Sequence, residues 1–265
     1  MAGGGPRVIT SVLDWLTDPA NWTGPGGIPA QTLTHLRLSF TALLLAGLIA
    51  VPLGLYVGHT GRGRVVAVNI VGAFRAIPSL GILFIAVLLL LPRLSGEAAY
   101  ELPTLIVLVL LAIPPILSGV YAGIAQVDPA ARDAARGMGM TGGQVLWQVE
   151  VPCALPLALS GIRSAMMQII ATATIAAVVG LGGLGRFLFD GQALQQYDRM
   201  AGGALAVAAL ALLVDLLLAG IQRLAVSPGL KADRGPRRIR RRLSADPRSV
   251  GSGTVDEPAE NVASA

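Results

Sequence analysis

Long runs of apolar residues alternate with short polar segments along most of the chain, and this pattern predicts membrane-spanning helices. A helix needs about 20 predominantly apolar residues to cross the hydrocarbon core of a bilayer. The pattern predicts five spans, at residues 36–57, 79–91, 102–124, 157–179 and 200–221. The second span is short and could begin earlier, because the preceding residues 65–76 are predicted to form a moderately apolar helix. We therefore predict an all-α, polytopic helical membrane protein.

The composition agrees with this class. Apolar residues make up 54% of the 265 residues and charged residues only 13%, with a mean hydropathy of +0.68. Soluble domains carry about twice that charged fraction. The single cysteine, Cys153, excludes an internal disulfide framework, and we interpret it as a buried, inert thiol.

The spans belong to one core domain at residues 32–225, which an N-terminal arm at residues 1–31 precedes. The arm contains Gly, Pro and Asn together with Trp15 and Trp22. Tryptophan favours the headgroup level of a membrane, so a short interfacial helix at residues 8–16 is one interpretation. A loose arm is the other.

The distribution of Lys and Arg predicts the orientation of the spans, because basic loops stay in the cytoplasm. The loops that hold Arg62 and Arg132 lie on the same side as the basic tail at residues 226–265, and the tail decides the balance. This places the N-terminus outside and the C-terminus in the cytoplasm. Most of the tail is predicted to be disordered. Its basic run at residues 231–243 is interpreted as a topology anchor on anionic lipid, with a salt-sensitive membrane switch as the alternative.

A polar segment at residues 128–156 separates two strongly apolar halves. Asp128 precedes a proline, which is a typical helix start. Glycines, among them Gly139, end this helix, and Thr141 can cap a second short helix that we expect to stop at Pro152. The segment therefore predicts a helix, a tight turn and a helix outside the hydrocarbon.

One motif in this segment has a regular spacing. Asp133-Ala134-Ala135, three residues, Gly139, nine residues and Val149-x-Val151-Pro152 follow the pattern EAA-x3-G-x9-I-x-L-P, with conservative replacements. The segment resembles the coupling loop of permease subunits in binding-protein-dependent ABC importers. The alternative is an ordinary amphipathic surface helix. The resemblance implies that the loop docks on a cytoplasmic ATPase subunit through Asp133, Ala134, Ala135, Gly139, Met140, Thr141, Val149, Val151 and Pro152.

The resemblance extends over about residues 32–231, where the chain looks like the permeases of osmoprotectant importers. The similar segments are residues 36–55, 77–80, 137–142, 161–163, 180–185 and 227–230, together with Asp215. The family implies the type I ABC importer permease fold, a bacterial cell-membrane location and uptake of glycine betaine, proline betaine, choline or carnitine by ATP-coupled alternating access.

The resemblance also implies the partners. They are a dimer of ABC ATPase subunits, an extracytoplasmic substrate-binding protein, a second copy of the permease, identical or related, and the lipid membrane. No Walker lysine motif is present in the sequence, so ATP and Mg are expected on the ATPase and no cofactor on this chain. An aromatic cage is the usual site for a quaternary ammonium, and aromatic residues are only 5% of the chain. The selecting cage is therefore expected in the binding protein.

Charged residues are rare inside the predicted spans and mark candidate sites. Arg163 and Asp215 lie at matching depths in the fourth and fifth spans, so we predict that they pair. The alternative is that each side chain snorkels separately to the interface. Gln168, Thr172 and Thr174 follow a near-helical spacing. They are candidates for facing a pore, or for ordinary contacts between helices.

Glycine-rich residues 180–185 follow the fourth span and literally fit the pattern G-x-G-x-x-G. A dinucleotide site needs a preceding strand, whereas here a membrane helix precedes the motif, so nucleotide binding is excluded. We expect a sharp turn, in which Gly180, Gly182 and Gly183 are candidates for an outer gate.

No catalytic constellation is found in the sequence, so we do not predict an enzyme. His35 and His59 have no companion ligand at metal spacing, and no nucleic-acid motif is present. Two alternatives to the osmoprotectant permease remain: the permease of a methionine-type amino-acid importer, and a channel or membrane scaffold without ATP coupling.

Overall fold

The computed structural model describes residues 5–66, 69, 72–73 and 78–226, and all of them lie in one structural unit. Every regular element in these ranges is a helix. Much of the predicted helix at residues 65–76, and the tail from residue 227 onwards, fall outside the described residues.

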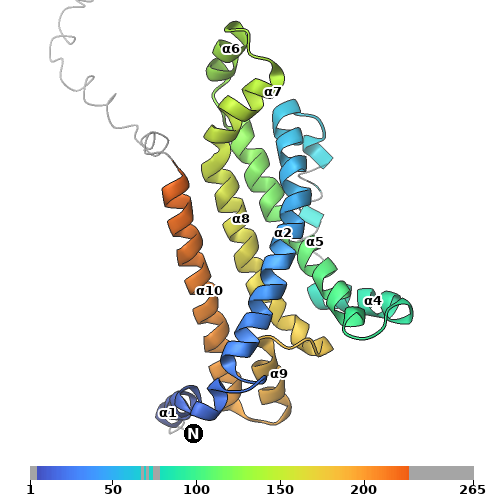
Figure 1. The fold of residues 1–265 in the computed structure, drawn as a ribbon, viewed down its shortest axis with the longest axis vertical. Helices are drawn as coiled ribbons and strands as arrows, with labels where there is room; N and C mark the ends of the chain where they lie inside the picture. Colours follow the sequence, from blue (N-terminus) through green and yellow to red (C-terminus); the bar gives the residue numbers. More distant parts are fainter. Residues whose placement is uncertain (1–4, 67–68, 70–71, 74–77, 227–265) are drawn as a thin grey trace, which may run out of the picture. The chain divides into compact units, whose positions relative to one another are not determined.

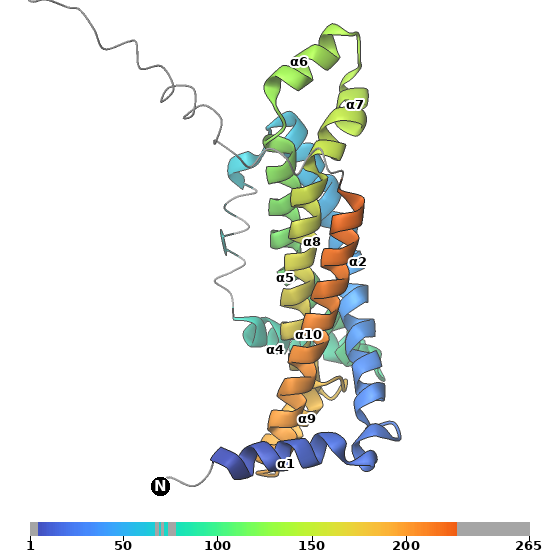
Figure 2. The same ribbon diagram turned by 90° about the vertical axis from the view of Figure 1, so that its left-hand side faces the viewer.

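Four long helical runs lie side by side in the described part of the chain and are long and apolar enough to cross a membrane (Figures 1 and 2). They contain four of the five predicted spans, which are thereby confirmed. The runs are α2 (Ile28–Thr60), α5 (Ala98–Ala125), the continuous run Gly142–Val179 around α8 (Val151–Ala173), and α10 (Tyr197–Ala225).

The second predicted span corresponds to α4 (Ser79–Leu90), which is followed by a short 3-10 turn, η2 (Leu91–Arg93). Twelve helical residues reach about 18 Å, less than the roughly 30 Å of the hydrocarbon core. The helix α4 alone is therefore too short to span a bilayer. The prediction of a complete second span depends on preceding residues that are in part not described.

The directions of α2 and α5 nevertheless require the chain to return from one end of the bundle to the other between these two helices. Arg37 of α2 pairs with Glu101 of α5 at 3.4 Å near the start of both helices. Near their other ends, Gly54 of α2 lies against Val120 of α5. The two helices are therefore parallel, and the chain must come back across the bundle before α5 begins.

Small residues allow α8 to pack closely and antiparallel against α5. A Cβ atom added to Gly119 would lie 2.7 Å from the Cα of Gly161, and one added to Gly161 would lie 2.6 Å from the carbonyl oxygen of Pro115. No larger side chain fits at either position, which is typical of membrane helices that associate through small residues. The core between α2, α5 and α8 is correspondingly rich in alanine: Ala42, Ala46, Ala50, Ala112, Ala165 and Ala173.

One end of the bundle, here named the α1 end, carries the short helices α1 (Gly5–Thr17) and α9 (Gly185–Ala193) (Figure 2). The helix α1 packs Trp15 edge-on against Phe187 of α9, with ring centroids 5.3 Å apart. Of the two interpretations of residues 8–16, the helix is the one formed, as part of α1. The 3-10 segment η1 (Pro19–Trp22) follows α1 in the chain, and the 3-10 segment η4 (Thr174–Val179) precedes α9.

The opposite end, named the α6 end, carries α6 (Pro129–Gly137) and α7 (Gly142–Val145) beyond the ends of α2 and α5 (Figure 1). The predicted order of helix, turn and helix at residues 128–156 is thus formed. It stands at the end of the bundle opposite to α1 and α9.

Candidate functional site

The helix α6 begins and ends as its sequence predicts. The Asp128 side chain accepts a hydrogen bond from the backbone N–H of Ala130 at 2.9 Å, and a proline follows at the first helical position. Beyond the last turn, Gly139 has a φ of +84°, which strains any residue with a side chain. The turn between α6 and α7 therefore needs glycine at this position of the motif.

The helix α7 also starts as expected, but it does not stop at Pro152. Thr141 and Gln144 form a reciprocal capping box at its N-terminus. The chain then passes through a π-helical turn, Leu146–Glu150, directly into α8. The N–H of Val151 bonds to the carbonyl of Leu146, five residues back, and Pro152 falls in the first turn of α8, where a proline is tolerated. The prediction of a helix end at Pro152 was wrong for this reason.

The predicted docking residues differ in their exposure to solvent. Asp133, Ala134, Gly139, Thr141 and Pro152 are exposed, whereas Met140, Val149 and Val151 are half-buried. The side chain of Ala135 is buried at 2% exposure, so it fixes α6 against the rest of the segment and offers no surface to a partner.

Two apolar side chains that the motif did not single out are well exposed beside these residues. Met138 is 77% exposed and Trp147 is 63% exposed. Both lie in the polar segment that projects beyond the long helices, so they offer apolar surface for a partner protein.

A buried carboxylate, which the sequence analysis missed, anchors this segment. Glu150 is 1% exposed, and its two oxygens contact basic side chains from two other helices. Arg132 of α6 places its Nε 2.8 Å from Oε1, and His59 of α2 places its Nδ1 2.6 Å from Oε2. Arg132 also donates from Nη2 to the carbonyl of Ile124, at the end of α5, at 2.5 Å. Residues of four helices therefore meet around Glu150.

The sequence contained a weak signal for this cluster. Glu150 is an acid seven residues before the predicted span at 157–179, and such an acid needs a cationic partner when it is buried. The partner His59 was interpreted as lone because it lies 91 residues away. The neighbouring Cys153 is exposed, so its interpretation as a buried thiol was wrong.

The structure brings Arg163 and Asp215 together within the bundle. Nε and Nη2 of Arg163 donate to Oδ1 and Oδ2 of Asp215, both at 2.5 Å, and so form a bidentate pair between α8 and α10. Nearby, Gln222 of α10 donates to the carbonyl of Pro156 in α8 at 3.0 Å. These two contacts fasten α10 to α8.

The three candidate pore residues do not gather at one place. Gln168 is exposed, and Thr172 lines a small cavity with Thr104 between α8, α5 and α4. Thr174 bonds to the backbone of its own helix, with Oγ1 2.8 Å from the carbonyl of Ala171.

The glycine-rich turn is held against the start of α2. Gly180, Gly182 and Gly183 have φ values of +85°, +82° and +81°, so each is in the left-handed region that favours glycine. The N–H of Gly183 donates to Gln31 Oε1 at 2.7 Å. The turn therefore lies at the α1 end, where the buried Gln31 fixes its position.

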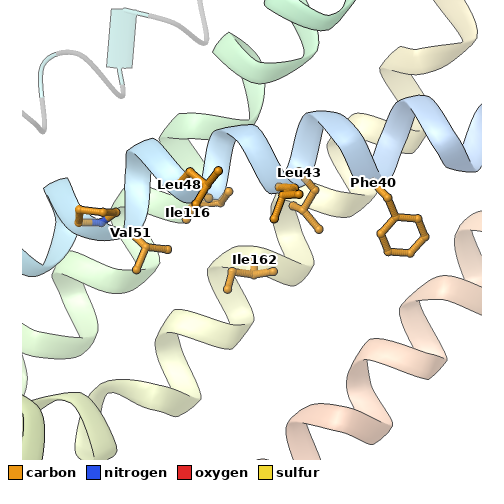
Figure 3. A pocket seen from close by; sticks show the side chains of 9 residues that line it. Phe40, Leu43, Leu48, Val51, Ile116 and Ile162 are labelled. Atoms are coloured by element: carbon orange, nitrogen blue, oxygen red, sulfur yellow. The ribbon is translucent and has the colours of Figure 1, made fainter.

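An apolar groove runs along α2. Figure 3 shows Phe40, Leu43, Leu48 and Val51 on α2 with Ile116 of α5 and Ile162 of α8. Its lining contains no charged or hydrogen-bonding side chain, so it does not fit a charged or zwitterionic solute. No group of three metal-binding side chains is found within the described residues either.

The chain belongs to the binding-protein-dependent transport system inner membrane component family, whose sequence profile matches residues 50–227. It is therefore a transporter permease subunit and a multi-pass protein of the bacterial plasma membrane.

Among its relatives is the glycine betaine/carnitine/choline transport system permease protein OpuCB of Bacillus subtilis, which is 33% identical over 79% of this chain and 93% of its own length. The carnitine transport permease protein OpuCB of Listeria monocytogenes is 35% identical over 72% of this chain and 85% of its own length. The osmoprotectant import permease protein OsmW of Salmonella typhimurium is 34% identical over 78% of this chain and 95% of its own length.

Among solved structures, the fold matches the inward-facing MetNI methionine ABC transporter with a TM-score of 0.65 at 21% identity. The match covers 80% of this chain and all of that one. This likeness confirms the all-α type I importer permease fold.

Proposed function

We propose that this permease takes up quaternary-amine osmoprotectants, namely glycine betaine, proline betaine, choline or carnitine. The observation that carries the proposal is that relatives from three organisms, each 33–35% identical, have names that specify these compounds or osmoprotectants in general. The methionine alternative depends on a likeness of fold at 21% identity, which supports the architecture alone.

The segment that carries α6 is proposed to dock on a cytoplasmic ATPase subunit that binds ATP and Mg. Its exposed Asp133, Met138 and Trp147 give it the mixture of charged and apolar surface typical of a protein interface. On this proposal the α6 end lies in the cytoplasm and the α1 end outside, with the N-terminus outside. The C-terminal tail then lies in the cytoplasm.

A second permease copy is proposed to complete the pathway. Many leucines of α10 are exposed, among them Leu212, Leu213, Leu216 and Leu217, at 59–65%. A face of this kind within a membrane is covered by lipid or by another helix. The extracytoplasmic binding protein would deliver its ligand at the α1 end, where Gly180, Gly182 and Gly183 form the proposed outer gate. The Arg163–Asp215 pair keeps α10 aligned with α8 while ATP binding and hydrolysis drive alternating access.

The substrate proposal is tested by reconstituting the chain with the ATPase and the binding protein that co-purify with it. Uptake of radiolabelled glycine betaine, carnitine, choline and proline betaine is compared with uptake of methionine. ATP-dependent uptake of at least one quaternary amine is expected. Uptake of methionine alone would overturn the osmoprotectant assignment, and ATP-independent flux would favour a channel.

Docking is tested by Asp133→Lys, because this side chain is 75% exposed and its replacement leaves the core of the segment intact. We expect the variant to lose co-purification of the ATPase. Asp14→Lys makes the same change of charge at an exposed position of the α1 end and serves as the control that retains the ATPase. Equal ATPase recovery with both variants would contradict docking through α6. Ala135→Asp is a poorer test, since burial of Ala135 makes that change disrupt folding.

A further inference from the structure

We propose that Glu150 is a positioning residue that links the docking helix α6 to α2 and α8, so that a displacement of α6 is transmitted to α2 as well as along the chain. The inference deepens the proposed function, because it names the side chains through which a docked ATPase would move the membrane helices. It starts from the contacts of one buried carboxylate.

Chain connectivity alone joins the docking segment to two membrane helices. The segment follows α5 directly, and it continues through α7 and the π turn into α8. The helix α2 precedes it by many residues and has no such connection. Its link to the segment is the contact of His59 Nδ1 with Glu150 Oε2 at 2.6 Å.

The second contact of Glu150 holds α6. Arg132 lies in α6 and contacts Glu150 Oε1 at 2.8 Å, while its Nη2 donates to the carbonyl of Ile124. The Arg132 and His59 side chains are only 20% and 23% exposed, so water screens these contacts weakly. A buried carboxylate paired with a guanidinium keeps its geometry, since loss of Arg132 would leave the Glu150 charge without its cation.

The position of Glu150 in its own helix supports the same role. It is the last residue of the π turn Leu146–Glu150, between the docking segment and α8. Turns of this type are rare and occur frequently at functional sites. Because the helical run continues from Gly142 to Val179 through this turn, α7 and α8 form one long helix. A rotation of α7 is therefore carried into the membrane at the residue that also holds α2 and α6.

The linkage is tested first on the full-length chain in lipid nanodiscs by amide hydrogen exchange, which needs neither partner nor substrate. We expect Glu150→Gln to increase exchange in both residues 56–60 of α2 and residues 129–137 of α6. His59→Gln should affect mainly α2, and Arg132→Gln mainly α6. Asp190→Asn is the control, because Asp190 also contacts two basic side chains but lies in α9, at the other end. Unchanged exchange in α2 with Glu150→Gln would overturn the proposal.

The second experiment uses the complex with the co-purifying ATPase and binding protein. It measures the amount of glycine betaine transported per ATP hydrolysed. We expect Glu150→Gln to lower this ratio about tenfold or more, with ATP hydrolysis largely retained, because the substitution removes the buried charge that holds α2 and α6. A proportional loss of both activities would indicate assembly or stability alone and would contradict the proposal. If the wild-type complex transports no quaternary amine, the substrate assignment fails, while hydrogen exchange still decides the linkage.

Discussion

Two carboxylates of this protein each contact two basic side chains, at opposite ends of the helix bundle. Glu150, at the α6 end, is 1% exposed, and its partners Arg132 and His59 come from two other helices. Asp190, at the α1 end, has a side chain that is 37% exposed. Its partners Arg186 and Arg199 are four and nine residues away along the chain. The two clusters each join one carboxylate to two basic side chains, but they differ in burial and connectivity.

The difference shows where an ion cluster can transmit force. Asp190 joins residues that the chain already holds close together, and exposed ion pairs contribute little because water and salt screen them. Glu150 joins residues of α2 and α6 that are far apart along the chain, and the cost of leaving a buried charge unpaired makes its contacts stiff. The α6 end therefore moves as one body, whereas the α1 end keeps a weaker and more local network.

The largest expected effect comes from Glu150→Ala. Removal of the carboxylate leaves Arg132 largely buried without its counter-charge and His59 Nδ1 without its partner, and breaking a buried ion pair costs about 3–5 kcal/mol. We expect a large fall in the denaturant or thermal midpoint of the purified protein in detergent, measured by tryptophan fluorescence. A midpoint within the error of the wild type would show that the cluster adds nothing to stability.

An intermediate effect is expected at the Arg163–Asp215 pair, whose side chains are 36% and 24% exposed. Asp215→Asn leaves an arginine without its counter-ion inside the membrane, so the midpoint should fall, but by less than with Glu150→Ala. The double variant Arg163→Met, Asp215→Leu removes both charges and should recover most of the loss. If the double variant is as unstable as the single one, the interaction is not an electrostatic pair.

The sequence predicted the Arg163–Asp215 pair and missed the Glu150 cluster, for a physical reason. Arg163 and Asp215 were found because both are charges inside apolar spans, at depths that a regular helix fixes. The Glu150 cluster depends on where the end of α2 meets a segment 91 residues later. No local pattern encodes that packing.

The same distinction applies to the fold. Apolar runs predicted the four long helices. Asp128 and Gly139 predicted the start and end of α6, and Thr141 predicted the start of α7, because caps and left-handed turns are local. The continuation of the helix through Pro152 depends on a π turn, which a proline in the sequence argues against. The second predicted span, at residues 79–91, corresponds to α4, and an earlier start falls on residues that the structure describes only in part.

A smaller effect is expected from Asp190→Asn. The change removes the charge that Arg186 and Arg199 share, and exposed pairs of this kind contribute about 0.2–1 kcal/mol each. Arg199 retains its position over the Phe187 ring, with 5.8 Å to the ring centroid. The midpoint should therefore fall only slightly. A loss as large as that of Glu150→Ala would mean that burial does not separate the two clusters.

The smallest effect, and the one that separates the clusters most directly, is their response to salt. At about 0.1 M ionic strength the screening length is roughly 10 Å, and at 1 M it is roughly 3 Å. Raising the salt should abolish the small stability difference between wild type and Asp190→Asn, because ions reach a side chain that is 37% exposed. The difference between wild type and Glu150→Ala should persist, because water and ions are excluded from a carboxylate that is 1% exposed. If the stability losses of Asp190→Asn and Glu150→Ala were equally sensitive to salt, Glu150 would be in contact with solvent. The docking helix would then lack the rigid connection to α2 that its proposed role requires.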